Sequence, residues 1–213
     1  MRVSICSVSS SLYFIQKTCN IFHMFILLFF IVSNVQSLSF SFPTFNQNTQ
    51  KIILGNDTTL TNKAIQLTAN RIDGSLHGSV GRASYKQAVR LWDKSTNKTT
   101  NFTTHFSFNI TQADKNPNYY GDGLAFFLAP FYVSADAPEE SSGGCLGLIG
   151  GASKSCNVTS TYPFVAVEFD SYHNKWDPGF SWDPSNDHVG INVNSVYSKA
   201  NFTVTESRPS VIG

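Results

Sequence analysis

Short stretches of alternating apolar and polar residues run through most of the chain. The clearest stretch reads VAVEFD and places Val165, Val167 and Phe169 on one face of a strand, with Glu168 and Asp170 on the opposite face. Clusters of Gly, Asn, Asp and Thr separate this stretch from others like it, and no convincing helical periodicity interrupts them. The pattern therefore predicts an all-β fold of short strands.

Three further stretches extend this pattern. Phe40, Phe42 and Phe45 alternate in what we expect to be the first strand, and Phe102–Ile110 alternates as a half-buried strand. Gly123–Pro130 is apolar on both faces, which is typical of a strand between two layers. Many short strands without helices favour an antiparallel β-sandwich, and no internal repeat divides the chain.

The N-terminal part has a different composition. Ile21–Val32 is a continuous apolar run, preceded by the basic residues Arg2 and Lys17 and followed by small residues suited to a cleavage site. The run is too short to span a membrane and has the layout of a signal peptide. We therefore predict a leader at residues 1–37, a single domain at 38–213, and a chain that is secreted, extracellular or vacuolar, with no membrane span after cleavage.

The charge of the remaining chain argues against two classes of partner. Of 15 basic residues two belong to the leader, which leaves 13 against 14 acidic residues. The domain is therefore nearly neutral and has no basic run or stripe. Nucleic acid and anionic membrane surfaces are disfavoured as partners.

Two of the four cysteines, Cys6 and Cys19, leave with the leader. Cys145 and Cys156 remain as a pair in a chain that enters an oxidising compartment, which favours a disulfide. Two free, buried thiols are the alternative.

The domain also carries six Asn-x-Ser/Thr sequons, which support passage through the secretory pathway. At least some of them should carry glycans and lie on the outside of the fold. They are Asn56, Asn97, Asn101, Asn109, Asn157 and Asn201.

The paired carboxylates of Glu168 and Asp170 indicate a bound cation. Two ionised carboxylates on one partly buried face repel each other unless a cation or a shared proton compensates them. The residues that follow offer amide, carboxylate and imidazole ligands, a mixture that suits Ca²⁺ together with Mn²⁺ or another transition ion. These ligands are Asn174, Asp177, Asp183 and His188.

The motif VEFDS, the Asn that follows it, two WDP turns and the later HVGINVNS together resemble the metal-binding core of the legume lectin family. The resemblance runs from Leu38 to about Ser195 and also covers GRASYKQAVRLWD, GDGLAFFLAP and GGCLGL. It implies a jelly-roll sandwich of a flat and a curved sheet. Family members continue beyond this region, so we expect a sandwich that is incomplete at its C-terminus.

The resemblance assigns metal ligands. Glu168 and His188 match the transition-metal ligands, and Asp170 matches a ligand that bridges this ion and Ca²⁺. Asn174 and the backbone carbonyl of Tyr172 match the calcium ligands.

A second bridging aspartate is expected between the two strands. The sequence offers two candidates, because the WDP turn occurs twice. Asp183 is preferred for its spacing to His188, and Asp177, which is closer to Asn174, is the alternative. Either could instead serve only as a turn residue.

The resemblance also implies a sugar site. Asp122, after a cis peptide bond to Gly121, would accept hydrogen bonds from sugar hydroxyls, and the Gly144 N–H would donate to the sugar. Asn174 would donate through its amide, and the Tyr172 ring would pack on the sugar. Since the calcium site supports these groups, loss of metal is expected to abolish binding.

The sequence thus predicts a Ca²⁺- and Mn²⁺-dependent lectin that binds glycans or glycoproteins. Both a monomer and a homo-oligomer are compatible with the sequence. One alternative is a defence or storage relative, or a detached receptor ectodomain, that keeps the fold without sugar binding. A jelly-roll glycosidase is a remote alternative, because the second catalytic Glu of such enzymes is replaced by Tyr172 or His173. We therefore expect no enzymatic activity.

Overall fold

The computed structural model describes residues 38–46, 50–61, 63–70, 77–111, 121–150, 156, 160–174 and 187–204. The chain divides into two compact units, Met1–Ser41 and Phe42–Gly213. In the first unit only residues 38–41 are described, and they form neither strand nor helix. The leader predicted for residues 1–37 lies outside the described residues.

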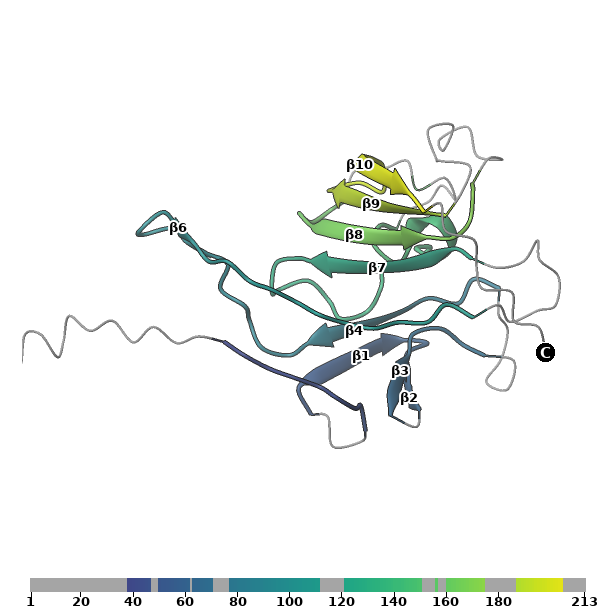
Figure 1. The fold of residues 1–213 in the computed structure, drawn as a ribbon, viewed down its shortest axis with the longest axis horizontal. Helices are drawn as coiled ribbons and strands as arrows, with labels where there is room; N and C mark the ends of the chain where they lie inside the picture. Colours follow the sequence, from purple (N-terminus) through teal and green to yellow (C-terminus); the bar gives the residue numbers. More distant parts are fainter. Residues whose placement is uncertain are drawn as a thin grey trace, which may run out of the picture. The chain divides into compact units, whose positions relative to one another are not determined.

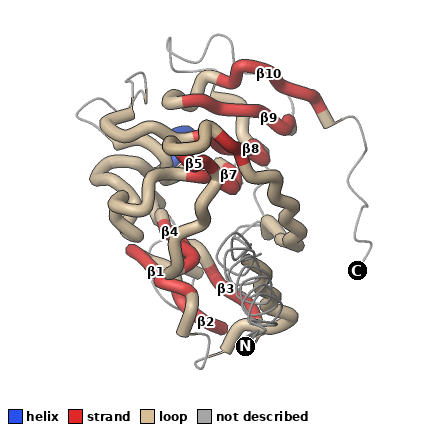
Figure 2. The backbone as a smooth tube through the Cα atoms, turned by 90° about the vertical axis from the view of Figure 1, so that its left-hand side faces the viewer, coloured by secondary structure: helices blue, strands red, loops and turns tan. Residues whose placement is uncertain are grey.

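The described part of the second unit consists of antiparallel strands and loops, with one short 3₁₀ helix, η1, at Gly143–Cys145 (Figures 1 and 2). It contains no helix with the length and apolar character needed to cross a bilayer. The predicted all-β class is therefore confirmed. Three two-stranded sheets pair β1 (Ile52–Asn56) with β4 (Gly81–Tyr85), β2 (Thr59–Thr61) with β3 (Ala64–Gln66), and β5 (Trp92–Asp93) with β6 (Lys98–Thr99).

A four-stranded antiparallel sheet has the spatial order β10–β9–β8–β7 (Figure 1). Sequence neighbours pair directly within it, so the hydrogen-bonded strands form a simple meander. Its strands are β7 (Gly123–Leu128), β8 (Val165–Asp170), β9 (His188–Val193) and β10 (Ser198–Thr203).

The register of this sheet places the polar residues together. Glu168 lies opposite Gly190, and Asp170 lies opposite His188. Because side chains alternate along each strand, Glu168, Asp170, His188 and Asn192 share one face, which we call the polar face. The alternation predicted for Val165–Asp170 is therefore present in the structure.

The hydrophobic core lies on the same side of the sheet, toward the beginning of β8. Ala166 of β8 and Phe127 of β7 are register partners there and pack with the residues around η1. Burial of these apolar groups stabilises the loop after β7 against the sheet. The buried members are Cys145, Leu148, Ile149, Cys156, Phe164, Ala166 and Val196.

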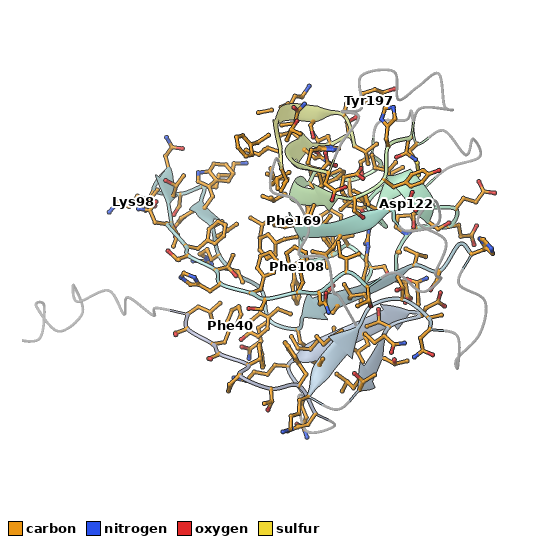
Figure 3. All side chains as sticks on the ribbon, turned by 45° about the vertical axis from the view of Figure 1, so that its right-hand side comes forward. Phe40, Lys98, Phe108, Asp122, Phe169 and Tyr197 are labelled. Carbon is orange, nitrogen blue, oxygen red and sulfur yellow. A yellow bond between two sulfur atoms is a disulfide. The ribbon has the colours of Figure 1, made fainter. Side chains whose placement is uncertain are left out.

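The strand predicted for Phe102–Ile110 is absent, because no strand is assigned over residues 100–111. The alternation still orients the side chains: the Phe108 ring lies 4.7 Å from that of Phe169 (Figure 3), and the Phe106 ring lies 5.5 Å from that of Phe126. A strand also needs a backbone ladder, and no described strand pairs with this segment. Among the described residues, ring contacts of Phe106 and Phe108 hold this segment against the sheet.

The predicted first strand is wrong as well. Phe45 forms a single isolated bridge with Lys63, and its ring stacks on Phe42 at 5.7 Å. Pro43 lies between the two phenylalanines and has no N–H group to donate to a ladder. The apolar pattern therefore produces ring packing at this point rather than strand pairing.

Candidate functional site

The candidate site lies where β7 begins and β8 ends, which are adjacent because the two strands are antiparallel. Asp122 immediately precedes β7, Asp170 closes β8, and residues 171–174 follow it. Figure 3 labels Asp122 beside the ribbon of β7, at the end where the strand begins. The η1 turn provides the third side of the site.

The backbone of Asp122 is fixed by the loop after β8. The Gly121–Asp122 peptide bond is cis, as the family resemblance implied. The Asp122 carbonyl accepts hydrogen bonds from the Ser171 N–H at 2.8 Å and from the Ser171 hydroxyl at 3.1 Å. A side chain at Gly121 would overlap Tyr172, so the Tyr172 side chain packs directly on this peptide. Asp122 and Tyr172 therefore lie close together at one corner of the site.

Asp122 is partly buried. Burial raises the pKa of Asp122 above its ordinary value of 3.8, while a hydrogen bond from the Asn174 side chain opposes the shift. A Cβ at Gly143 would lie 3.7 Å from Asp122 Oδ2. The carboxyl group thus lies near both Asn174 and the η1 turn, and its partial burial makes hydrogen bonds to it stronger than in bulk water.

Gly144 and Asn174 are in close contact. A Cβ at position 144 would lie 2.9 Å from both Nδ2 and Oδ1 of Asn174. The Asn174 amide interacts with Asp122, while its Oδ1 atom is buried and receives no hydrogen bond within the described part of the chain. A buried amide oxygen of this kind is a suitable ligand for a hard cation such as Ca²⁺.

Glu168 and His188 form a buried pair on the polar face. His188 Nε2 lies 3.3 Å from Glu168 Oε1, and each side chain is no more than 3% exposed. Asn192 Nδ2 donates to Glu168 Oε2 at 2.6 Å. The Ser198 hydroxyl lies within hydrogen-bonding distance of Glu168 Oε1 and of Asn192 Oδ1, the latter at 2.8 Å. The carboxylate is therefore held by three neighbours.

Sequence reasoning did not identify Asn192 and Ser198. Period-two alternation from His188 could have placed Asn192 on the polar face. Ser198 was harder to find, because the register of β10 shifts between Ser198 and Ala200. Such a bulge cannot be located from the polar pattern alone.

Asp170 is buried next to this pair. Its Oδ1 atom accepts a hydrogen bond from the Tyr172 N–H at 2.8 Å, which ties the end of β8 to the loop that carries Asn174. Asp170 is thus the register partner of His188 and is hydrogen-bonded to the loop that follows β8.

The two candidate bridging residues, Asp177 and Asp183, lie outside the described residues. Within the ranges that are described, no three His, Cys, Asp or Glu side chains are close enough together to hold a metal ion. Carboxylate and imidazole from Glu168 and His188 nevertheless match a transition ion, and carboxylate and amide oxygens from Asp170 and Asn174 match Ca²⁺. The chemical types of these donors therefore suit the two metals.

Cys145 and Cys156 are joined by a disulfide, with a Cα–Cα distance of 5.3 Å. The predicted disulfide is therefore confirmed, and the alternative of two free thiols is wrong. Because Cys145 directly follows Gly144, the bond fixes the η1 turn at the edge of the site. Both cysteines are buried in the core.

Five of the six sequon asparagines fall within the described residues, and all five are exposed. An attached glycan requires an exposed asparagine, and these five positions meet that requirement. Glycosylation itself stays a prediction. They are Asn56, Asn97, Asn101, Asn109 and Asn201, whereas Asn157 lies outside the described residues.

The amino-acid sequence is similar to those of known proteins. The family profile described as the legume lectin domain matches residues 37–211. The mannose/glucose-specific lectin of Centrolobium tomentosum is 42% identical over 164 residues, which cover 76% of this chain and 63% of the relative. The 2-acetamido-2-deoxy-D-galactose-binding seed lectin 2 of Cytisus scoparius is 41% identical over 166 residues, covering 77% and 62%.

The chain is also similar to solved structures of legume lectins. The winged bean acidic lectin complexed with methyl-α-D-galactose superposes with a TM-score of 0.64 at 32% identity, covering 81% of this chain and 66% of the other. Legume lectin structures are β-sandwiches, which confirms the predicted class. The chain spans less than two thirds of the length of each of these relatives.

Proposed function

Because the chain belongs to the legume lectin domain family, we propose that it is a lectin that binds mono- or oligosaccharides non-covalently. The observation that carries this proposal is the juxtaposition of Asp122, Gly144 and Asn174, three residues from three separate loops. They bring together a carboxylate, a backbone N–H without an obstructing side chain, and an amide. These are the polar groups that recognise adjacent sugar hydroxyls.

Each group has a defined role in the proposal. The ionised Asp122 carboxylate accepts hydrogen bonds from two sugar hydroxyls, and its partial burial strengthens them. The Gly144 N–H and the Asn174 amide donate to sugar oxygens. The Tyr172 ring, next to Gly121, offers an apolar surface for the C–H face of the sugar.

We further propose that Ca²⁺ and Mn²⁺ are the resident ions. Glu168 and His188 would hold Mn²⁺, Asn174 and the Tyr172 carbonyl would hold Ca²⁺, and Asp170 would contact both. Asp183, or Asp177 in its place, would supply the remaining carboxylate. The ions would neutralise the buried carboxylates and hold the 171–174 loop against Asp122.

The relatives' names support a carbohydrate ligand and offer two sugar classes. One relative is named for mannose and glucose, another for 2-acetamido-2-deoxy-D-galactose. We also propose that the chain is a secreted glycoprotein, because exposed sequons accompany the predicted leader. No catalytic step is proposed, since Tyr172 and His173 stand where a glycosidase strand would supply its second Glu.

A glycan array tests the proposal directly. The purified chain, loaded with Ca²⁺ and Mn²⁺, is compared with the Asp122→Asn variant, which keeps the size of the side chain and removes its charge. The proposal predicts binding to glycans with terminal mannose, glucose, galactose or N-acetylgalactosamine, and loss of this binding in the variant. Absence of binding by the well-folded, metal-loaded wild-type chain would contradict it.

A further inference from the structure

A buried arginine anchors the loop that carries Gly144. Arg82, on β4, is 4% exposed. Its Nε and Nη2 atoms both donate to the carbonyl of Gly147, at 2.8 and 2.5 Å, and Nη2 also lies 3.4 Å from the carbonyl of Leu148. Arg82 thus binds the segment that immediately follows the η1 turn.

The same guanidinium binds the segment that precedes the turn. Its Nη1 atom donates to the carbonyl of Asp136 at 3.2 Å and to that of Ser134 at 3.4 Å. Residues 134–136 and 147–148 flank the stretch that contains Gly144. One side chain therefore closes the base of this loop, which limits the conformations open to the residues between its ends.

Aromatic groups complete the surroundings of the guanidinium. The Tyr162 hydroxyl accepts from Arg82 Nη2 at 2.5 Å and donates to the Leu148 carbonyl at 2.6 Å. The centre of the Phe127 ring lies 4.9 Å from the guanidinium carbon. Among the described residues the contacts of Arg82 include no carboxylate, so backbone carbonyls and rings stabilise its charge. Only the planar fork of arginine reaches these acceptors together.

Backbone hydrogen bonds connect the anchored segment to Gly144. The Gly147 N–H donates to the Ser141 carbonyl at 2.8 Å, and the Leu146 N–H donates to the Gly143 carbonyl at 2.9 Å. A displacement of Gly147 therefore moves the whole turn. The gap between Gly144 and the Asn174 side chain allows almost no such movement, because a Cβ at 144 would already be 2.9 Å from the amide.

We propose that Arg82 is a positioning residue for the carbohydrate site: it holds residues 134–148 so that Gly144 stays against Asn174 and Asp122. The inference rests on the proposed function, in which the Gly144 N–H contacts the sugar. Arg82 itself acts through its hydrogen bonds to the carbonyls of Gly147 and Asp136. It contributes to affinity by preorganising a donor that it does not touch.

The test compares three variants of the full, metal-loaded chain. Arg82→Lys keeps the positive charge and loses the fork, and Tyr162→Phe removes only the hydroxyl that links Arg82 to Leu148. Arg90→Lys is the matched control, because Arg90 is an exposed arginine. Titration calorimetry with methyl-α-mannoside and methyl-α-galactoside measures sugar affinity, and chelator competition measures calcium affinity. Hydrogen–deuterium exchange follows the loop amides.

We expect Arg82→Lys to weaken binding of the glycoside that the wild type prefers by about tenfold or more. Exchange should become faster in 134–148 and stay unchanged in β8 and β9, and calcium affinity should not change. Tyr162→Phe should produce a smaller effect of the same kind, and Arg90→Lys none. A residue that merely stabilised the fold would instead raise exchange throughout and leave affinity unchanged below the melting temperature.

The inference would be overturned if Arg82→Lys kept a glycoside affinity within about twofold of the wild-type value and the exchange of the loop amides were unchanged. If Arg82→Lys does not fold, Tyr162→Phe decides by the same two measurements. If the wild type binds neither glycoside, the proposed function fails for these sugars. In that case loop exchange still decides, because unchanged exchange in 134–148 would refute anchoring by Arg82.

Discussion

Gly144 and Asn174 approach each other so closely that a methyl group at position 144 would come within 2.9 Å of both atoms of the Asn174 amide. Gly144 belongs to the turn after β7, and Asn174 belongs to the loop after β8. The same amide contacts Asp122. The absence of a side chain at 144 is therefore what lets the three loops meet.

We predict that Gly144→Ala reduces sugar affinity by about tenfold or more, since the new methyl group must displace the Asn174 amide from Asp122. The fold should tolerate the change within about 1 kcal/mol, because the atoms that must move are the end of a side chain. Titration calorimetry and thermal unfolding measure the two effects.

Ser142→Ala is the control for this variant. Ser142 precedes η1, and its side chain makes no capping hydrogen bond. It should therefore keep the affinity of the wild type. Equal sugar binding by Gly144→Ala and Ser142→Ala would show that the contact with Asn174 does not matter.

Glu168→Gln should weaken Mn²⁺ binding by more than about tenfold. The variant keeps the shape of a residue that is 2% exposed but removes the charge that would balance the cation. Glu139→Gln is the control, because Glu139 is an exposed glutamate outside the strands that form the polar face. Manganese titration followed by electron paramagnetic resonance gives the affinities, and equal values for the two variants would remove Glu168 from the metal site.

Replacing Cys145 and Cys156 by alanine should lower the free energy of unfolding by about 2–4 kcal/mol, because the unfolded chain gains freedom when the crosslink is removed. Urea unfolding measures the difference. The wild type under reducing conditions should lose a similar amount. An unchanged urea midpoint of unfolding in both experiments would mean that the disulfide does not stabilise the fold.

Phe108→Ala should destabilise the fold by about 1–2 kcal/mol, since the Phe108 ring packs 4.7 Å from the ring of Phe169 although it is 43% exposed. Phe131→Ala is the control, with a ring that is 67% exposed. Its effect should stay below about 0.5 kcal/mol. If the two variants unfold at the same urea concentration, residues 100–111 are not held by these rings.

Much of the sheet and of the proposed sugar site could be predicted from the sequence. Alternation in Val165–Asp170 fixed which side chains share a face, because the period of a strand leaves only two choices. The family motifs then identified Asp122, Gly144 and Asn174, which the structure brings into contact. Local patterns succeeded where one strand or one short motif carries the information.

The remaining features depend on partners that are distant in the chain. Phe102–Ile110 alternates like a strand, yet strand formation needs a ladder partner that alternation does not reveal. Arg82 carries no local sign of its proposed role, because all but one of its hydrogen-bond acceptors are backbone carbonyls beyond residue 133, and the other is the Tyr162 hydroxyl. Any residue type could supply those carbonyls, so only the folded structure shows the contact.

The most direct test of the account is glycan binding before and after removal of the divalent ions. The full chain is measured on the same array as purified, after chelation, and after addition of Ca²⁺ and Mn²⁺, with elemental analysis at each stage. The account predicts that binding is lost on chelation and recovers when both ions return. Binding that persists in protein shown to be free of both ions would contradict it.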